Sequence, residues 1–330
     1  MAKSQLKGRW SAILIRSALG FGILAFVFWS IDLRAVVTKF IYIRPTLAFA
    51  LCFTAIMDRV LMAYKWNLLL RARRISLSLW QAIHLYFVGN LLGTFTPGAI
   101  GADAYRISAL SRFHKNQVTA STVILERLIG LAVIATFALV ALPISAQYIG
   151  KGAKSIVWTI MALAILVIIA VLISLRPSIV ERIARRFPYM SRISIAKRLR
   201  DFYLTYAESR SHSRALLAFT LLTAFEVILL VGISYLAARS LVVNVSFGYF
   251  LCIIPLLHIL IRLPVSFQGI GIQEGLFAYF LMAGGFSAAD GLSISLLLRM
   301  AEMISVFLPG AVLLCICPFR LRPSANPTGN

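Results

Sequence analysis

Two stretches of the sequence place helix-breaking residues and charged side chains close together within apolar surroundings. The first, residues 89–106, interrupts its apolar run and then carries a carboxylate and a guanidinium; the residues concerned are Pro97, Gly98, Gly101, Asp103 and Arg106. Proline lacks an N–H and glycine tolerates positive φ, so a continuous helix is not expected here. A helix starting near residues 99–101 would present free N–H groups, which favour anions such as a phosphate. Arg106 could add to such a site, whereas Asp103 could cap the helix or hold a cationic headgroup.

The second stretch, residues 262–275, repeats this pattern more loosely. It also has a proline, two closely spaced glycines and then a carboxylate, namely Pro264, Gly269, Gly271 and Glu274. In a membrane a broken backbone must be buried in protein or line a wet cavity, because lipid cannot satisfy the freed N–H and C=O groups. Broken helices with polar residues beside the break are a recurring substrate site of transporters.

The composition excludes an ordinary soluble domain and a disordered chain. Of 330 residues, 60% are hydrophobic and only 13% are charged, which indicates a polytopic membrane protein. The net charge is +22, from 33 Lys and Arg against 11 Asp and Glu. These basic residues lie between apolar runs, so they indicate orientation against an anionic leaflet and not binding of nucleic acid.

The apolar runs predict an all-α polytopic membrane protein with about six full spans. We expect them at residues 11–31, 45–62, 121–142, 156–175, 215–236 and 294–318. The connection 176–214 has ten basic and three acidic residues, and the short segment 65–74 has four basic residues, so both are expected in the cytoplasm. The connection 176–214 lies there only if the segment 77–97 is a re-entrant helical hairpin, which enters and leaves on the cytoplasmic side. By the same logic the segment 247–275 is a re-entrant helical hairpin that enters and leaves on the opposite side.

This arrangement predicts a single transmembrane domain over residues 1–330, built as an inverted-topology repeat. Its halves are about 1–142 and 156–318, and each reads as span, span, re-entrant segment, span. We expect both termini and the basic connection 176–214 in the cytoplasm. The polar tail, residues 323–330, is expected to be disordered.

Nine charged residues lie within or beside the apolar segments: Asp58, Arg59, Glu126, Arg127, Glu226, Arg262, Glu274, Arg299 and Glu302. Unpaired at span centres they would cost about 25 kcal/mol together, so they must be paired, near an interface or facing a wet cavity. Arg299 and Glu302 are spaced i,i+3 and can share a helix face. Glu126 and Arg127 are adjacent, so each is expected to pair with another span. Ion pairs that only lock helices together remain an equal alternative for Asp58 with Arg59 and for Arg299 with Glu302.

No motif for catalysis, metal binding or nucleotide binding is present. The four cysteines lie in or at the end of apolar runs, and no H-x-x-x-H, C-x-x-C, G-x-S-x-G or Walker pattern occurs. We therefore expect no enzymatic activity, no cofactor and no metal. Any transport would be passive, or coupled to an ion or a partner.

Residues 96–106 resemble the first signature of the lysylphosphatidylglycerol synthase transmembrane-region family, a flippase-like family. Residues 263–275 resemble its second signature, and Glu126, Arg127 and the segment around Arg299 fit its general pattern. The resemblance covers about residues 12–318. One departure is Phe267-Gln268, where the family usually has small residues and glycine. The full-length synthases carry an aminoacyl transferase domain, which we do not expect in this chain.

The resemblance implies movement of a polar-headgroup lipid between the leaflets of a bacterial inner membrane. We expect the headgroup to pass through a cleft lined by substrate-binding residues from both breaks. These are Pro97, Gly98, Gly101, Asp103, Arg106, Glu126, Arg127, Gly269, Gly271, Glu274 and Arg299. The implied partners are membrane lipids: an anionic or aminoacylated phospholipid, a hopanoid or a polyprenyl-linked lipid. Two alternatives stay open: a transferase acting on a lipid-linked donor, and a membrane partner of a lipid-biosynthesis enzyme that docks through residues 176–214.

Overall fold

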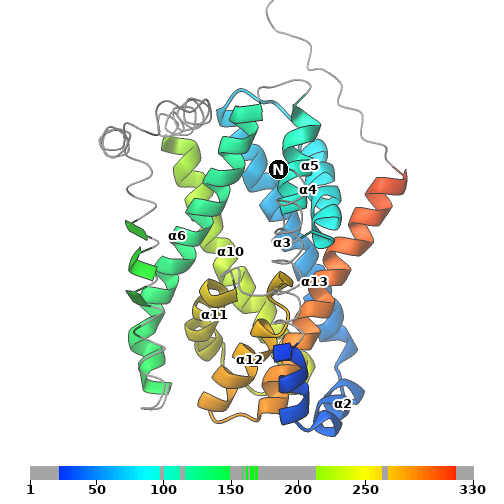
Figure 1. Ribbon diagram of the computed structural model, residues 1–330, viewed down its shortest axis with the longest axis vertical. Helices are drawn as coiled ribbons and strands as arrows, with labels where there is room; N and C mark the ends of the chain where they lie inside the picture. The colour runs from blue at the N-terminus through cyan, green and yellow to red at the C-terminus, as the bar shows by residue number, and fades with distance from the viewer. Residues whose placement is uncertain are drawn as a thin grey trace, which may run out of the picture.

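The computed structural model is helical in every element that it describes (Figure 1). The described residues are 22–96, 100–111, 116–148, 213–261 and 267–316, with a few single positions between 158 and 169. The elements in chain order are α2 (Leu33–Ile41), α3 (Pro45–Ala72), α4 (Leu79–Thr94), α5 (Ile100–Leu110), α6 (Asn116–Tyr148), α10 (Ser213–Ser240), α11 (Phe247–Ile261), the 3₁₀ turn η5 (Phe267–Gly269), α12 (Ile272–Ala283) and α13 (Ala288–Ile316). The expected all-α polytopic class is confirmed.

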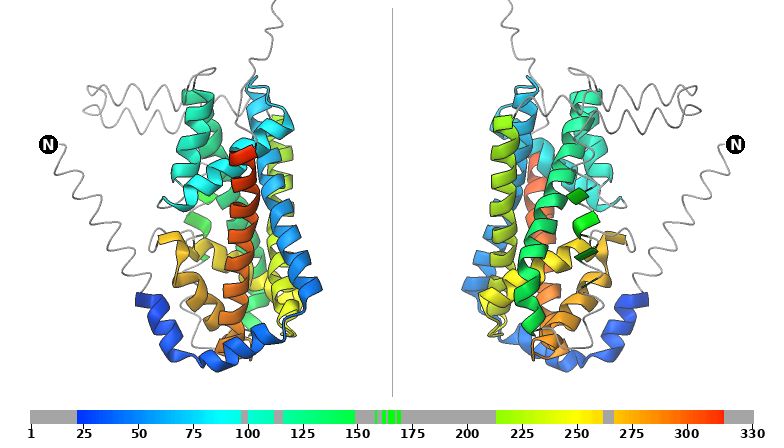
Figure 2. Two further views of the ribbon diagram at one scale, coloured as in Figure 1. Left: turned by 90° about the vertical axis from the view of Figure 1, so that its right-hand side faces the viewer. Right: turned by 90° about the vertical axis from the view of Figure 1, so that its left-hand side faces the viewer.

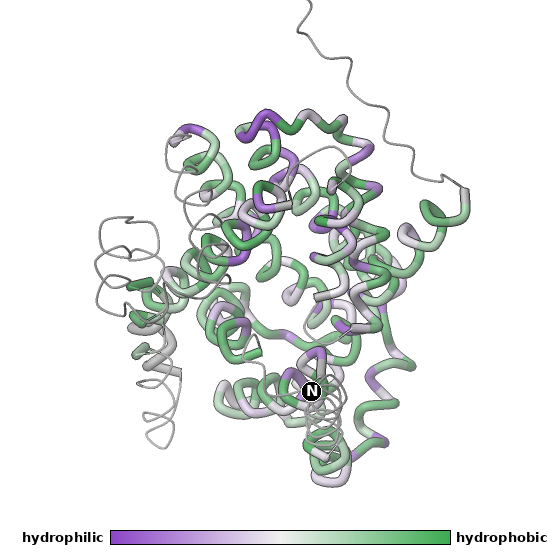
Figure 3. Tube along the Cα trace, turned by 45° about the horizontal axis from the view of Figure 1, so that its top comes forward, coloured by the Kyte–Doolittle hydropathy of each residue, from purple (hydrophilic) through white to green (hydrophobic). Residues whose placement is uncertain are grey.

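Four of the described helices are long and apolar enough to cross a membrane: α3, α6, α10 and α13. Their 28 to 33 residues correspond to about 42–50 Å, against about 30 Å of hydrocarbon. Large apolar side chains such as Phe49, Phe53 and Leu221 are more than half exposed on them, as lipid contact requires. Figure 3 shows that hydrophobic residues predominate along the described helices.

The observed spans extend beyond several predicted bounds. The span expected at 45–62 continues to Ala72 in α3, so residues 65–72 are helix and not part of a loop. The span expected at 294–318 begins six residues earlier, in α13, so Arg299 lies well inside the helix and not near its start. The spans predicted at 11–31 and 156–175 lie largely outside the described residues, as do the basic connection 176–214 and the tail.

The two halves share an order of elements: a long helix, a broken helical pair and a second long helix. In the first half these are α3, then α4 with α5, then α6; in the second they are α10, then α11 with α12, then α13. Helices α3 and α10 both have 28 residues. The pair α4 and α5 lies toward one end of the long helices, and α11 and α12 lie toward the other (Figures 1 and 2).

The C-terminal ends of α3 and α10 are alike in detail. Arg74 and Val242, each two residues beyond its helix, adopt left-handed φ values of 59° and 60°. The following N–H, of Ile75 or Val243, returns to a carbonyl five residues earlier at 3.0 and 2.9 Å. This pattern closes a helix and satisfies its last carbonyls.

The next helix in each half then starts from a serine cap six residues after the preceding helix ends. The hydroxyl of Ser78 accepts from the N–H of Gln81 at 3.2 Å, and that of Ser246 accepts from the N–H of Tyr249 at 3.1 Å. A serine at this position satisfies an N–H that the helix leaves unpaired. The same local chemistry therefore turns the chain in both halves.

Candidate functional site

The break between α4 and α5 is held by a hydrogen-bonded threonine. Helix α5 begins at Ile100, in agreement with the start expected at residues 99–101. The N–H of Gly101 donates to Oγ1 of Thr96 at 2.9 Å, and that hydroxyl donates to the carbonyl oxygen of Gly93 at 2.9 Å. One free N–H of the helix start is therefore already used by the protein. Pro97 and Gly98 lie outside the described residues.

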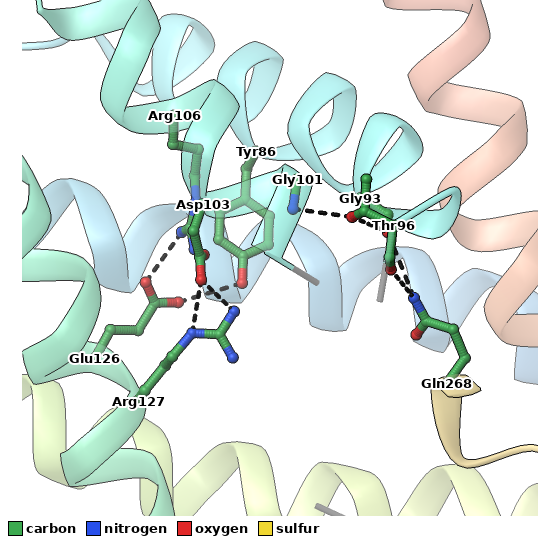
Figure 4. A network of polar contacts seen from close by, with 9 residues as sticks. All are labelled: Tyr86, Gly93, Thr96, Gly101, Asp103, Arg106, Glu126, Arg127 and Gln268. Carbon is green, nitrogen blue, oxygen red and sulfur yellow. Dashed lines mark hydrogen bonds and ion pairs between the residues drawn. The ribbon is translucent and has the colours of Figure 1, made fainter. Parts of the chain in front are cut away.

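Helices α5 and α6 bring four charged side chains into one chain of ion pairs (Figure 4). Arg106 donates to Asp103 at 2.6 Å and to Glu126 at 3.0 Å. The other oxygen of Asp103 accepts two hydrogen bonds from Arg127, at 2.5 and 2.8 Å. Tyr86 on α4 donates to Glu126 at 3.3 Å. Glu126 and Arg127 thus each pair with another helix, as their adjacency predicted.

Arg106 is the buried centre of this chain, with only 4% of its surface exposed. Its guanidinium carbon lies 5.0 Å from the ring centre of Trp66 and 4.8 Å from that of Tyr86. Aromatic faces attract a desolvated cation, and a planar guanidinium stacks on them. The ring contacts and the two carboxylates therefore fix Arg106 in place, while Arg127, whose side chain is 49% exposed, is held on one side only.

A second group of charges joins α3 to α10 and α13. Lys65 on α3 is 3% exposed, forms an ion pair with Glu226 on α10 and donates to the hydroxyl of Thr223 at 3.2 Å. Arg59, also on α3, pairs with Glu302 on α13 at 3.0 Å. The i,i+3 spacing of Arg299 and Glu302 does not produce a pair between them, because each finds a partner on another element.

Apart from Glu302, the charged residues of these two groups line one cavity of about 390 Å³ between α3, α4, α5, α6 and α10. Its wall carries four cationic and three carboxylate side chains: Arg59, Lys65, Arg106, Arg127, Asp103, Glu126 and Glu226. Asn90 and Thr223 add neutral polar groups. Residues of α6 and α10 form an apolar part of the wall, including Leu131, Ile134 and Leu230. The cavity can therefore hold a polar, charged group of either sign beside an apolar one.

The second break is stabilised separately from this cavity. Glu274 is 1% exposed, accepts from the N–H of Gly271 at 2.7 Å and pairs with Nε of Arg299 at 2.7 Å. Arg299 also donates to the carbonyl oxygen of Gly269 at 3.4 Å. Gly269 and Gly271 have φ values of 71° and 83°, which side chains with a Cβ rarely adopt. Glu274 and Arg299 therefore hold the turn, and neither lines the cavity with Asp103 as the sequence had suggested.

Gln268 connects the two breaks. Its Nε2 donates to the carbonyl oxygen of Thr96 at 3.0 Å and to that of Gly93 at 3.4 Å (Figure 4). Its own backbone adopts a left-handed φ of 52°. The sequence identified this residue only as a departure from the family pattern, at a place where glycine is usual. A long amide side chain at this position reaches the backbone carbonyls of the first break, where the carbonyl of Gly93 also accepts from the hydroxyl of Thr96.

The predicted site residues form two sets. Gly101, Asp103, Arg106, Glu126 and Arg127 gather at the first break, whereas Gly269, Gly271, Glu274 and Arg299 gather at the second. Sequence reasoning missed Lys65, because it was counted with the basic residues of a loop. The available signal was the lack of a helix breaker between residues 62 and 72.

The comparison with protein families gives one match. The model of the Lysylphosphatidylglycerol synthase TM region matches residues 13–310, which includes both breaks and every helix that lines the cavity. No curated protein sequence matches the chain.

Proposed function

The chain belongs to the Lysylphosphatidylglycerol synthase TM region family, and from this premise we propose that it moves a polar-headgroup lipid between the leaflets of a bacterial inner membrane. Membership of the family supports a role in handling membrane lipid. In this proposal the headgroup passes through the cavity lined by Asp103, Arg106 and Arg127, and the acyl chains stay in the surrounding bilayer.

The observation that carries the proposal is the mixed-charge cavity itself. Seven charged side chains line it within a bundle of apolar helices. Charges within transmembrane segments are costly and mark substrate pathways more often than ordinary packing. A headgroup phosphate can take the place of a carboxylate beside Arg127, and an amine can take the place of an arginine beside Asp103. Such exchanges keep each buried charge paired during transfer.

The similar halves of the chain supply a means of alternating access. We interpret α3 to α6 and α10 to α13 as an inverted-topology repeat, whose broken pairs α4–α5 and α11–α12 lie toward opposite ends of the long helices (Figure 2). Transporters of this kind open to each side in turn by moving one repeat against the other. Gln268, which bonds one break to the other, is then the contact across which the two halves move.

Leaflet exchange in vesicles tests the proposal. Purified protein is reconstituted with phosphatidylglycerol and phosphatidylethanolamine that carry a fluorescent acyl chain, and a membrane-impermeant quencher reports the outer-leaflet fraction. We expect the protein to raise the exchange rate of at least one of these lipids well above that of protein-free vesicles. Arg127→Gln should abolish this increase, because Arg127 is the most exposed cation of the Asp103 chain.

Arg34→Gln is the matched control, because Arg34 is an exposed arginine on α2 and does not line the cavity. Mass spectrometry of co-purified lipids identifies the headgroup, comparing wild type with an Asp103→Asn, Arg106→Gln double variant. Equal exchange with and without protein, or full activity of Arg127→Gln, would contradict the proposal. The reading as a membrane partner of a lipid-modifying enzyme would then be preferred.

A further inference from the structure

Three of the membrane-crossing helices carry a carboxylate at their midpoint. Asp58 is the fourteenth residue of the 28 in α3, and Glu226 is the fourteenth of the 28 in α10. Glu302 is the fifteenth of the 29 in α13. With a rise of about 1.5 Å per residue, each lies about 20 Å from either end of its helix. These carboxylates are therefore as far from both helix ends as the fold allows.

Asp58 differs from the other two because its charge is not matched. It is 4% exposed, and its Oδ1 is buried without any hydrogen-bond partner. Its charged neighbours are Arg59 and Lys65 on the same helix, Glu226 on α10 and Glu302 on α13. Both of these cations are already engaged, Arg59 by Glu302 and Lys65 by Glu226.

A count of the charges around the cavity also shows that Asp58 has no counter-charge. The cations Arg59, Lys65, Arg106 and Arg127 are matched, in the described part of the chain, by Glu302, Glu226, Glu126 and Asp103. Tyr86 on α4, which donates to Glu126, is neutral. An ionised Asp58 would add one uncompensated negative charge at the middle of the bundle. A buried carboxyl group avoids this cost by keeping its proton.

We propose that Asp58 is a proton-binding site, which carries a proton at rest and exchanges it with water in the cavity. Asp58, Met62 and Lys65 are spaced i, i+4 and i+7, so they share one face of α3, and the latter two line the cavity. When the proton leaves, the O–H bond breaks, its electron pair stays on the carboxylate and water accepts the proton. Coupling of this exchange to lipid movement rests on the function proposed above.

The same charge balance sets the direction of the coupling. A headgroup that adds positive charge to the cavity favours loss of the Asp58 proton, because the carboxylate then becomes its counter-charge. A headgroup that adds negative charge favours retention of the proton. A transmembrane proton gradient would then drive lipid movement, which would supply energy without a nucleotide site.

Infrared difference spectroscopy of the purified, reconstituted protein tests the proton site directly. We expect the carbonyl-stretch band of a protonated carboxylic acid at neutral pH, shifted on transfer to D2O. Asp58→Asn should remove this band, whereas Asp32→Asn should retain it, because Asp32 is exposed at the start of α2. Absence of the band from the wild type, or its persistence in Asp58→Asn, would overturn the proposal. Asparagine is used because it resembles the neutral acid. Monodispersity on size-exclusion chromatography checks that the Asp58→Asn variant is folded.

A second measurement tests the coupling. The leaflet-exchange rate of fluorescent phosphatidylglycerol and phosphatidylethanolamine is compared with and without a pH gradient across the vesicle membrane. We expect a several-fold change for the wild type and none for Asp58→Asn. Gradient-independent exchange by the wild type, or an unchanged response of Asp58→Asn, would overturn the coupling. Absence of all exchange would refute the proposed function, and the infrared result would still decide the proton site.

Discussion

Gln268 donates from its Nε2 to the carbonyl oxygen of Thr96 at 3.0 Å, which joins two helix breaks that are 172 positions apart in the chain. Gln268 itself has a left-handed backbone, a conformation that favours glycine. The backbone of Gln268 is therefore strained, and its long amide side chain contacts the other break. Two substitutions at position 268 can therefore test the hydrogen bond and the backbone strain separately.

Gln268→Ala removes the hydrogen bonds and keeps the strain, whereas Gln268→Gly removes both. We expect Gln268→Ala to lower the free energy of unfolding by about 1 kcal/mol, since a polar contact between membrane helices contributes about 0.6–1.7 kcal/mol. Gln268→Gly should remain close to the wild type, because relief of left-handed strain returns about 1 kcal/mol. Thermal unfolding in detergent measures the difference. Equal midpoints for the two variants would contradict the role given to strain.

Arg106 and Arg127 share the Asp103 carboxylate but differ in burial, so their loss should have unequal cost. Arg106→Gln leaves Glu126, whose side chain is 11% exposed, without its cation and should destabilise the protein by about 3 kcal/mol or more. Arg127→Gln should cost about 1 kcal/mol or less, because that side chain is 49% exposed. Thermal unfolding of the two variants provides the comparison.

Adding Glu126→Gln to Arg106→Gln provides the control for that comparison. The second substitution removes the stranded carboxylate, so the double variant should be more stable than Arg106→Gln alone. A double variant whose loss equals the sum of the single losses would show that the two side chains do not interact energetically.

Gly93 permits the close approach of α4 and α5, on which the position of Arg106 depends. A Cβ at Gly93 would lie 2.7 Å from the Cβ of Ala102 and 3.0 Å from its backbone nitrogen. Gly93→Ala must therefore push α5 away and should lower both stability and leaflet exchange. Overpacking of this kind costs about 1–3 kcal/mol.

Gly232→Ala is the matched control, because it also places alanine at a helical position, in α10, but its Cβ meets no atom within 4 Å. We expect it to stabilise the protein by about 0.5–1 kcal/mol, since alanine favours helix more than glycine does. Similar unfolding midpoints for Gly93→Ala and Gly232→Ala would refute the close approach of α4 and α5.

Within the described residues, the sequence predicted the four long apolar helices and the two breaks between them, because the apolar runs and the Pro/Gly breaks are local signals. The start of α5 at Ile100 agrees with the prediction for the same reason. The partners of the buried charges were harder to predict. Arg299 and Glu302 have spacing suited to a helical pair, yet Arg299 binds Glu274 and Glu302 binds Arg59. Local spacing shows which side chains can meet on one helix, but the packing of other helices decides which of them do.

Lys65 illustrates a second limit of the sequence. A lysine followed by three arginines within ten residues is typical of a cytoplasmic loop, and the lack of a helix breaker shows only that Lys65 can be helical, not that it is buried. Its burial depends on Glu226, which lies 161 positions away on α10. This buried ion pair between α3 and α10 could therefore be recognised only after both helices had been placed side by side.

Variants of Lys65 and Glu226 can distinguish a contribution to stability from a contribution to lipid exchange. Glu226→Gln strands a lysine that is 3% exposed, so we expect a loss of about 3 kcal/mol or more in unfolding free energy. Adding Lys65→Met removes the stranded charge and keeps the length of the side chain, which packs over the ring of Phe219. The double variant should therefore regain most of the lost stability. Leaflet exchange should nevertheless be abolished in the double variant, because the cavity has lost both a cation and a carboxylate from its wall. A stable double variant that exchanges lipid at the wild-type rate would show that this pair serves only to join α3 to α10.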